Sequence, residues 1–219
     1  MSDVSLLRNT DLFKDLDSTT LESLRERTRV RRVHRGDILF SEGEAAAELF
    51  IVSSGRIAIA AKSGDGRESV MALMERGDLF GEMSLFDGER RSAEARALST
   101  SEVLVVPFEP VRELYDERPE LLWHVVELLL LRLRSTNAAL ADSVFLDVTG
   151  RTAKRLIELS GGAKEFVLPV TQEELAGMVG ASRERVNKAI ASFIRLGWIE
   201  QVDRKYVFTD QEQLTRRAR

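Results

Sequence analysis

The chain has 219 residues, of which 43% are hydrophobic and 31% are charged, a composition that is ordinary for a globular protein of one or two domains. It contains no cysteine, which excludes disulfide bonds and any iron–sulfur or haem site that depends on cysteine ligands. Its two histidines, His34 and His124, lie far apart in the sequence and form no metal-ligand pattern.

The sequence shows no sign of an export signal or of a membrane segment. Its first residues, MSDVSLLRNTDLF, lack the charged and then apolar layout of a signal peptide. The longest apolar region, LLWHVVELLLL at 121–131, is interrupted by His124 and Glu127 and is too short to span a bilayer. We therefore expect a cytoplasmic protein with no membrane partner.

The net charge of −4 is distributed unevenly along the chain. From Asp147 onward, 13 Lys and Arg residues stand against 10 Asp and Glu residues, so the negative excess lies in residues 1–146. Such asymmetry favours a basic C-terminal segment that binds a partner, although an excess this small is also common in proteins that bind no polyanion.

The N-terminal part of the chain is predicted to begin with short helices and to continue as short strands. Residues 3–29 fit short helices, with Asp17 or Ser18 as the N-cap of TTLESLRER. Residues 36–88 hold eight of the fourteen glycines, and GDG at 64–66 is a candidate hairpin turn. Between the glycines and after them lie the apolar or alternating runs DILF, ELFIVSS, RIAIAA, ESVMALM and VLVVPF. Short strands with regular turn signals predict a small antiparallel barrel or sandwich.

A long helix is predicted after Pro119. Residues there follow one another at alternating steps of four and three, which is a heptad seam over a helix of about 25 residues. The seam contains Leu122, Val126, Leu129, Leu133, Thr136, Leu140 and Ser143. Such a seam must be buried, either against its own domain or against a second copy of the chain. Thr136 is a polar residue within it, and a polar residue there costs stability and so suggests a specific role.

The segment that opens with FLDVTGR at 145–151 carries the pattern of a helix-turn-helix. After an amphipathic helix, TAKRLIELS, Thr171 and Glu174 form a capping box that starts the next helix. Gly180 supplies a left-handed turn residue, and Ser182 can cap a second helix. Two short helices joined by a glycine-containing turn are typical of this motif.

The second helix of the motif is predicted to pack through Val186, Ile190 and Ile194, and Gly197 ends it. The runs WIEQV and KYVFT, separated by Asp203 and Arg204, are predicted to form a hairpin wing. Trp123 and Trp198 are expected to pack rather than to read bases.

Charged and polar side chains crowd the first turns of this second helix, at Arg183, Glu184, Arg185, Asn187 and Lys188. Arginine can bind guanine O6 and N7, glutamate can accept from cytosine N4, and the start of a recognition helix is the part that meets base edges. A charged helix face is more often simply solvated, but the cap, the glycine turn, the apolar spacing and the wing together favour DNA binding. No nucleophile–base pair or metal cluster is evident, so an enzyme is the least expected reading.

The segment 80–96, FGEMSLFDGERRSAEAR, breaks the strand pattern with one carboxylate, Glu82, and two cations, Arg90 and Arg91. Taken singly, Glu82 would be a surface carboxylate and the two arginines would belong to a solvated turn. Gly81 beside them would let the backbone approach a ligand closely, and the ligand-site reading itself comes from the family resemblance of this segment.

The whole chain resembles the CRP/FNR family of bacterial transcription regulators, and within it the cyclic AMP receptor proteins. The motifs that carry the resemblance are GDLFGEMSLFDGERRSAEARA, RLRSTN, FLDVTGR and QEELAGMVGASRERVNKAI, in the family's order over essentially all of residues 10–210. The resemblance implies an α+β fold with a cyclic-nucleotide-binding, jelly-roll-like β-roll at 1–118, a dimerisation helix and hinge at 119–146, and a winged helix-turn-helix at 147–219.

By this resemblance the allosteric ligand is cAMP, and no metal is needed. Arg91 would neutralise the phosphate, Ser92 would add a hydroxyl, and Glu82 would accept from the ribose 2′-hydroxyl. Arg132 would pair with Glu82, while Thr136 of the same chain and Asn137 of the partner subunit would reach the purine. The implied ligand residues are Gly81, Glu82, Met83, Ser84, Arg91, Ser92, Arg132, Thr136 and Asn137.

The resemblance also implies partners: a palindromic double-stranded DNA site of the TGTGA type, a second copy of the chain, and RNA polymerase. The implied DNA contacts are Thr171, Gln172, Ser182, Arg183, Glu184, Arg185, Asn187 and Lys188. The family's prototype carries threonine at the position of Arg185, arginine at Lys188 and serine at Asn137. The base read by Lys188 and the purine preference are therefore open, since lysine lacks the guanidinium fork.

Two alternatives remain at this point. One is a regulatory subunit that releases a catalytic partner when it binds a cyclic nucleotide, which would need no base-reading helix. The other is a family member that acts without a ligand, or that responds to cGMP or cyclic di-GMP. Activation and repression of transcription are both compatible with the sequence.

Overall fold

The computed structural model describes residues 3–62, 68–203 and 205–219. The chain divides into two compact units, Met1–Leu133 and Arg134–Arg219. The expected hairpin turn at 64–66 lies outside the described residues. Among the helices of the described ranges, none combines the length and the apolar character needed to cross a membrane.

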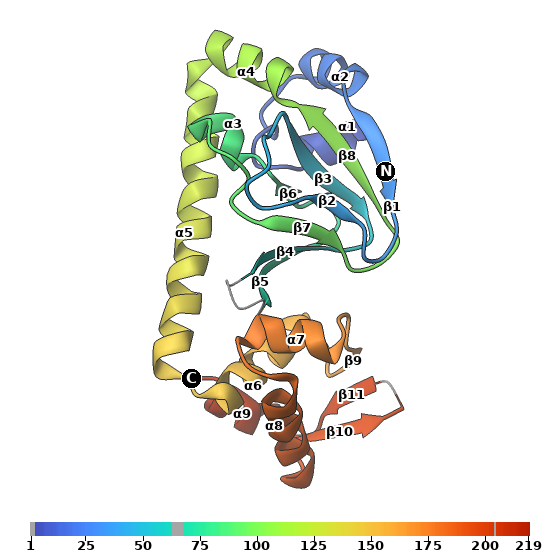
Figure 1. Cartoon of the computed structure of the whole chain (residues 1–219), viewed down its shortest axis with the longest axis vertical. Helices are drawn as coiled ribbons and strands as arrows, with labels where there is room; N and C mark the ends of the chain where they lie inside the picture. Colours follow the sequence, from blue (N-terminus) through green and yellow to red (C-terminus); the bar gives the residue numbers. More distant parts are fainter. Residues whose placement is uncertain (1–2, 63–67, 204) are drawn as a thin grey trace. The chain divides into compact units, whose positions relative to one another are not determined.

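The N-terminal unit contains two four-stranded antiparallel sheets (Figure 1). Their strand orders are β1–β8–β3–β6 and β2–β7–β4–β5. Side chains of both sheets meet in one core, in which the rings of Phe50 and Phe80 stack at 5.3 Å. The predicted antiparallel sandwich is thereby confirmed. The strands are β1 (Arg29–Val33), β2 (Ile38–Phe40), β3 (Glu48–Ser54), β4 (Ile57–Lys62), β5 (Glu68–Met74), β6 (Leu79–Phe80), β7 (Glu94–Ala97) and β8 (Ser101–Pro107).

Strands β2, β3, β4, β5 and β8 coincide with the predicted apolar runs, whereas β1 and β7 were not predicted. Their sequences, RVRRV and EARA, are rich in charged residues and hide the usual alternation. β1 is an edge strand that pairs only with β8 and buries Val33 alone. Charged side chains on an edge strand are common because they oppose pairing with other chains.

Helices flank the strands of this unit and pack on the first sheet. α1 (Asp3–Arg8) and α2 (Ser18–Glu26) precede the strands, as predicted for residues 3–29, and α4 (Phe108–Glu117) follows them. Leucines of these helices join Ile51 and Leu104 of the sheet in a second core.

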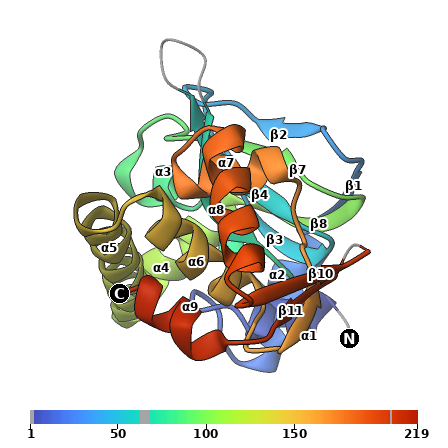
Figure 2. The ribbon, with the colours of Figure 1, turned by 90° about the horizontal axis from the view of Figure 1, so that it is seen from below.

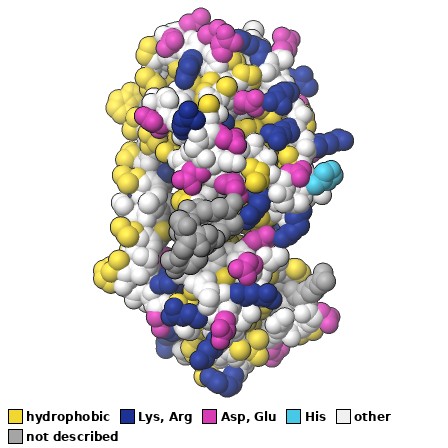
Figure 3. All heavy atoms as spheres, in the orientation of Figure 1, with side chains coloured by type: hydrophobic (Ala, Val, Ile, Leu, Met, Phe, Trp, Pro, Cys, Tyr) yellow, Lys and Arg dark blue, Asp and Glu magenta, His cyan; other side chains and the backbone are white. Residues whose placement is uncertain are grey.

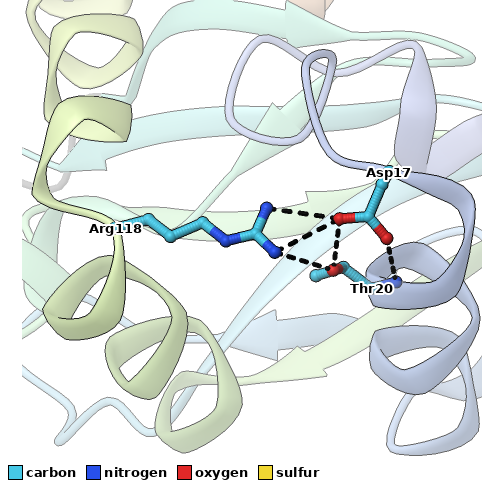
Figure 4. A network of polar contacts seen from close by, with 3 residues as sticks. All are labelled: Asp17, Thr20 and Arg118. Atoms are coloured by element: carbon cyan, nitrogen blue, oxygen red, sulfur yellow. Dashed lines mark hydrogen bonds and ion pairs between the residues drawn. The ribbon is translucent and has the colours of Figure 1, made fainter.

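Asp17 is the N-cap of α2 and also bonds the segment that leads into the long helix (Figure 4). Its carboxylate accepts hydrogen bonds from the Thr20 backbone N–H at 2.9 Å and from the Thr20 hydroxyl at 2.8 Å. Both terminal nitrogens of Arg118 donate to it at 3.2 Å. These bonds, those from Thr20 first, lower the pKa of Asp17 to about 2.

The predicted long helix is present as α5 (Leu122–Phe145), after a short 3-10 turn, η1 (Pro119–Leu121). Val125 and Leu128 are buried in the core of the N-terminal unit. The apolar residues of the predicted seam are instead exposed, with relative exposures from 41% for Val126 to 62% for Leu140. The seam is therefore not buried against its own domain. This favours the other predicted arrangement, in which a second copy of the chain buries it.

The C-terminal unit is a winged helix-turn-helix. α7 and α8 pack against each other and against α6, and a three-stranded sheet of order β10–β11–β9 lies beside them (Figures 1 and 2). Asp147 caps α6 by accepting from Gly150 N at 2.8 Å. The third strand, β9, was not predicted. The elements are α6 (Val148–Leu159), β9 (Glu165–Val167), α7 (Gln172–Val179), α8 (Arg183–Arg195), β10 (Ile199–Val202), β11 (Lys205–Phe208) and α9 (Gln211–Arg217).

Candidate functional site

Glu82 is a buried carboxylate at the start of a short helix. The chain leaves β6, turns at Gly81 with φ of +79°, and enters α3 (Met83–Asp87) directly after Glu82. Glu82 is only 1% exposed, so it is not the solvated surface carboxylate of the alternative reading. Burial raises the pKa of its carboxyl, and the nearby Arg132 guanidinium partly opposes this rise.

The expected pairing of Glu82 with Arg132 is present. Arg132 reaches from α5, donates to Oε1 of Glu82, and donates to the Leu79 carbonyl at 3.0 Å. Within the described part of the chain, the second carboxylate oxygen of Glu82, Oε2, is buried and has no hydrogen-bond partner. A buried acceptor without a partner is costly. This oxygen is therefore suited to accept a hydrogen bond from a ligand.

Arg91 is a buried cation, 6% exposed, rather than part of a solvated turn. It donates from Nη1 to the Gly81 carbonyl and from Nη2 to the Glu48 carbonyl, each at 2.6 Å. No carboxylate among the described residues forms an ion pair with it, and its buried Nε has no hydrogen-bond partner there. Burial lowers the pKa of Arg91, and three nearby glutamates oppose this effect. A buried guanidinium without a counter-ion is suited to bind an anion.

Aromatic rings hold the Arg91 side chain in place, a feature that sequence reasoning missed. Its Cζ lies 4.1 Å from the ring centroid of Phe40 and 5.6 Å from that of Phe50. A guanidinium over a ring face is attracted by the ring quadrupole. Phe40 and Phe50 lie on strands of different sheets, so no local sequence signal could have placed them around Arg91.

The other predicted ligand residues of the N-terminal unit directly follow Glu82 or Arg91 in the chain. Ser84 is buried, whereas Met83 and Ser92 are exposed and in contact, with Ser92 Oγ 3.7 Å from Met83 Sδ. Thr136 and Asn137 are exposed on α5 one turn beyond Arg132, in the part of the helix that belongs to the C-terminal unit. Their contact with a ligand remains a prediction.

Arg132 also lines a cavity of about 370 Å³. Its wall includes Asp78, whose carboxyl has a pKa that is raised by partial desolvation. Sequence reasoning did not find it, because it is formed by three separate segments. They are residues 9–12, residues 73–79 and the α5 residues Leu128 and Arg132.

The helix-turn-helix is built as the sequence predicts. The side chain of Thr171 accepts from Glu174 N at 3.2 Å, and the Glu174 carboxylate accepts from Thr171 N at 2.6 Å, which completes the capping box. Gly180 has φ of +67° in the turn, and Ser182 caps α8. The predicted apolar face of α8 is wrong at one position. Ile194 is 38% exposed, and Phe193 is buried instead. The step from Ile190 to Phe193 is three residues, which keeps the face on the core side.

The predicted base-reading face of α8 is open to solvent. Arg183, Glu184, Arg185, Asn187 and Lys188 are all exposed. Within the described ranges, none of these five side chains has a hydrogen-bond or ion-pair partner. These charges are therefore free to bind a polyanion without first breaking a contact inside the protein.

The start of α7 is joined to the wing. Gln172 donates from Nε2 to the Tyr206 hydroxyl on β11 at 3.0 Å. A groove of about 600 Å³ runs between the two elements, and Arg183 contributes to its wall. Trp198 stacks on Phe193 at 5.8 Å, so the prediction that it packs is confirmed. For Trp123 the same prediction is wrong within the single chain, because this residue is 71% exposed.

Comparison with known families matches both units. Residues 30–118 match the cyclic nucleotide-binding domain, and residues 150–217 match the Crp-like helix-turn-helix domain. The "CRP-like cAMP-activated global transcriptional regulator" of Mycobacterium tuberculosis (strain ATCC 25618 / H37Rv) is 36% identical over 98% of this chain and 99% of its own length. The chain belongs to the CRP/FNR family of transcription regulators. The members that it matches are named as regulators, so the family assignment also indicates a regulator rather than an enzyme.

Further CRP/FNR relatives agree with this assignment. The "cAMP-activated global transcriptional regulator CRP" of Escherichia coli O6:H1 is 30% identical over 82% of this chain and 89% of its own length. Among solved structures, the "c-di-GMP Responsive Global Regulator CLP" of Xanthomonas campestris has a TM-score of 0.75 at 27% identity, and the match covers 88% of this chain and 99% of that one. These matches confirm the fold class that the sequence predicts.

Proposed function

We propose that the chain is a homodimeric regulator that binds cAMP in its N-terminal unit and a palindromic DNA site through its C-terminal unit. The observation that carries the proposal is a pair of buried charged groups at the site, each of which lacks a binding partner. Arg91 is a buried cation without an ion pair among the described residues, and Oε2 of Glu82 is a buried acceptor without a donor there. A cyclic nucleotide supplies an anionic phosphate and a ribose hydroxyl, which are the two groups that would complete them.

The remaining ligand residues follow from the same site. The backbone at Gly81, Met83 and Ser84 would approach the phosphate, and the exposed Ser92 hydroxyl would donate to it. Arg132 would hold Glu82 in position for the ribose. Thr136 of the same chain and Asn137 of the partner subunit would contact the purine. No metal enters this scheme, because Arg91 supplies the positive charge.

Dimerisation is supported by the exposed seam of α5. Hydrophobic side chains follow the edge of the molecule along this helix (Figure 3), and Leu122, Leu129 and Leu133 are each 45–54% exposed. Burial of a heptad seam against its copy would remove these leucines from water. Ligand binding would then bias the hinge at Asp147 and Val148, and thereby the spacing of the two recognition helices.

DNA binding is supported by the unpaired charges of α8. In the proposed complex Arg183, Glu184 and Lys188 would reach base edges, with Arg185, Asn187 and Ser182 beside them. Thr171 and Gln172 would bind the phosphate backbone. RNA polymerase is the further partner proposed from the family, and such a regulator works in the cytoplasm.

The ligand proposal is tested by calorimetry with cAMP, cGMP and cyclic di-GMP. The wild-type protein should bind cAMP, and Arg91→Ala should weaken binding by roughly 100-fold, since hydrogen bonds to a charged group contribute about 1.5–3 kcal/mol each. Arg90→Ala is the matched control, because Arg90 is exposed and donates to the Gly43 carbonyl at 2.9 Å. This control should leave the affinity unchanged.

The same titration separates the alternatives. The related structure from X. campestris is named as c-di-GMP responsive, so preferential binding of cyclic di-GMP would replace cAMP as the ligand. Failure to bind any of the three nucleotides would indicate a regulator that acts without this ligand. Equal binding by the wild-type protein and Arg91→Ala would contradict the site itself.

A further inference from the structure

A second exposed apolar stripe lies on α5 beside the seam. Trp123 and Leu130 are seven residues apart and therefore share one face of the helix, and they are 71% and 48% exposed. At about 100° per residue, this stripe is displaced by roughly 70° from the seam. Val125 and Leu128, which are buried against the N-terminal unit, lie on the opposite side of the seam.

Two-fold symmetry determines what this second stripe would face. In a dimer held at the seam, each N-terminal unit lies on the flank of its own α5 that carries Val125, Leu128 and Arg132. When the two α5 helices are parallel, the dimer axis runs along them, and rotation about it places the partner's N-terminal unit on the other flank. That flank is the one that carries Trp123 and Leu130.

The N-terminal unit has an exposed apolar surface on α3, the helix next to α5. Met83 and Phe86, both on α3, are 44% and 37% exposed. α3 lies beside α5 (Figure 1), and the residue before it, Glu82, is held to this helix by Arg132. Phe86 is supported from within by an edge contact with Tyr115 at 5.7 Å.

We propose that Trp123 and Leu130 of the partner subunit cover Met83 and Phe86 on α3. The inference rests on the proposed dimer and goes beyond it, because it assigns to the partner a part of the wall of the nucleotide site. α3 directly follows Glu82 and contains Ser84, and both are proposed ligand residues. Its first turn would therefore be held in place by the partner, and each nucleotide site would be complete only in the dimer.

Cross-linking tests this contact directly, because the chain has no cysteine of its own. The double variant Phe86→Cys/Trp123→Cys is treated with a short bismaleimide and run on a denaturing gel. We expect a covalent dimer. Phe86→Cys alone and Trp123→Cys alone should give no covalent dimer on the gel. Val30→Cys/Trp123→Cys should also give no covalent dimer, since Val30 is 52% exposed but lies on the edge strand β1.

A seam variant separates failure of this inference from failure of the dimer. Leu133→Cys alone should cross-link to its copy in any dimer held at the seam. If Leu133→Cys cross-links and the double variant does not, the contact with α3 is wrong and the dimer stands. If Trp123→Cys alone cross-links as well as the double variant does, Trp123 faces its own copy and the inference is overturned. If Leu133→Cys also fails, the dimer and the contact that depends on it are both wrong.

A second measurement avoids any change to α3. Trp123 and Trp198 are the only tryptophans of the chain, so in Trp198→Phe the fluorescence reports on Trp123 alone. Quenching by acrylamide should fall several-fold as the protein concentration rises through dimerisation. Quenching that stays at the level of an exposed indole in a dimer verified by sedimentation would contradict the proposal.

Discussion

The two units of this protein use charge in opposite ways. In the N-terminal unit Glu82 and Arg91 are buried, at 1% and 6% exposure, and are held by Arg132, by carbonyls and by aromatic rings. In the C-terminal unit Arg183 and Lys188 are exposed and, among the described residues, have no ionic partner. One unit presents a few desolvated charges that are held by neighbouring groups, and the other presents charges that are exposed to water.

This difference corresponds to the two kinds of ligand. A buried, oriented charge interacts strongly with one small molecule of the right shape, because the local dielectric is low and salt does not screen it. Exposed charges bind a polyanion through many contacts, each of which is weakened by salt. We therefore expect DNA affinity to fall steeply as salt is added, and nucleotide affinity to change little.

The largest effect is expected at the recognition helix. Arg183→Ala should weaken binding to the specific DNA site by about 1–3 kcal/mol, or roughly 5- to 150-fold, and relax base preference at one position. Arg195→Ala is the matched control, because Arg195 is exposed in the last turn of the same helix. Competition binding against variant sites measures both quantities. Equal losses for the two variants would mean that the start of α8 does not read bases.

Features formed by residues close together in the chain could be predicted from the sequence, and features formed by distant residues could not. The capping box of Thr171 and Glu174, the turn at Gly180 and the cap at Ser182 each involve neighbours in the chain, and all were predicted correctly. The ring of Phe40 over Arg91 joins residues from separate strands, and only the fold brings them together.

The exposure of Trp123 was also outside the reach of sequence reasoning. An indole at helical spacing beside a heptad seam has the appearance of a core residue, yet the structure leaves it 71% exposed. Likewise β7 reads as a polar segment, although Glu94, Ala95 and Ala97 are buried in it. The residue type alone does not show whether a side chain is buried within its own chain or left exposed on its surface.

A smaller effect is expected where the backbone approaches Arg91. A Cβ at Gly81 would lie 2.8 Å from Nη1 of Arg91, and the φ of +79° disfavours other residues. Gly81→Ala should therefore displace the guanidinium and weaken nucleotide binding roughly tenfold, or about 1.4 kcal/mol, because Arg91 loses part of its contact with the phosphate. Gly88 has a similar φ of +72°, but an added Cβ there would meet open space. Gly88→Ala therefore introduces the backbone strain without displacing Arg91, and it serves as the control. If both variants lose nucleotide affinity to a comparable extent, displacement of Arg91 is not the cause.

Nucleotide affinity should also depend on pH through Glu82. Its pKa is raised by burial, and a protonated carboxyl is a poorer acceptor for the ribose hydroxyl than a carboxylate. Affinity should therefore be full well above this raised pKa and should fall as the pH is lowered through it. Calorimetry from pH 7 downward measures the change. Glu82→Gln should bind more weakly and lose this dependence, and a retained dependence would point to another group.

The smallest effect is expected at Asp17, which is exposed and far from either site. Its pKa is lowered from 3.8 to about 2, first by the bonds from Thr20 and then by Arg118. Its contribution to stability is therefore fully present above pH 3.8 and is lost as the pH falls towards 2. Asp17→Asn should slightly lower the melting temperature at neutral pH and flatten its decline over this acid range. An unchanged acid profile would mean that the cap does not contribute.

The most direct test of the whole account is the coupling between the two units. The affinity for a palindromic DNA site is measured at one fixed salt concentration, with and without saturating cAMP, for the wild-type protein and for Arg91→Ala. The account predicts that cAMP raises the affinity of the wild-type protein and leaves that of Arg91→Ala unchanged. A wild-type affinity that is the same with and without cAMP, or an equal response of the two proteins, would contradict it.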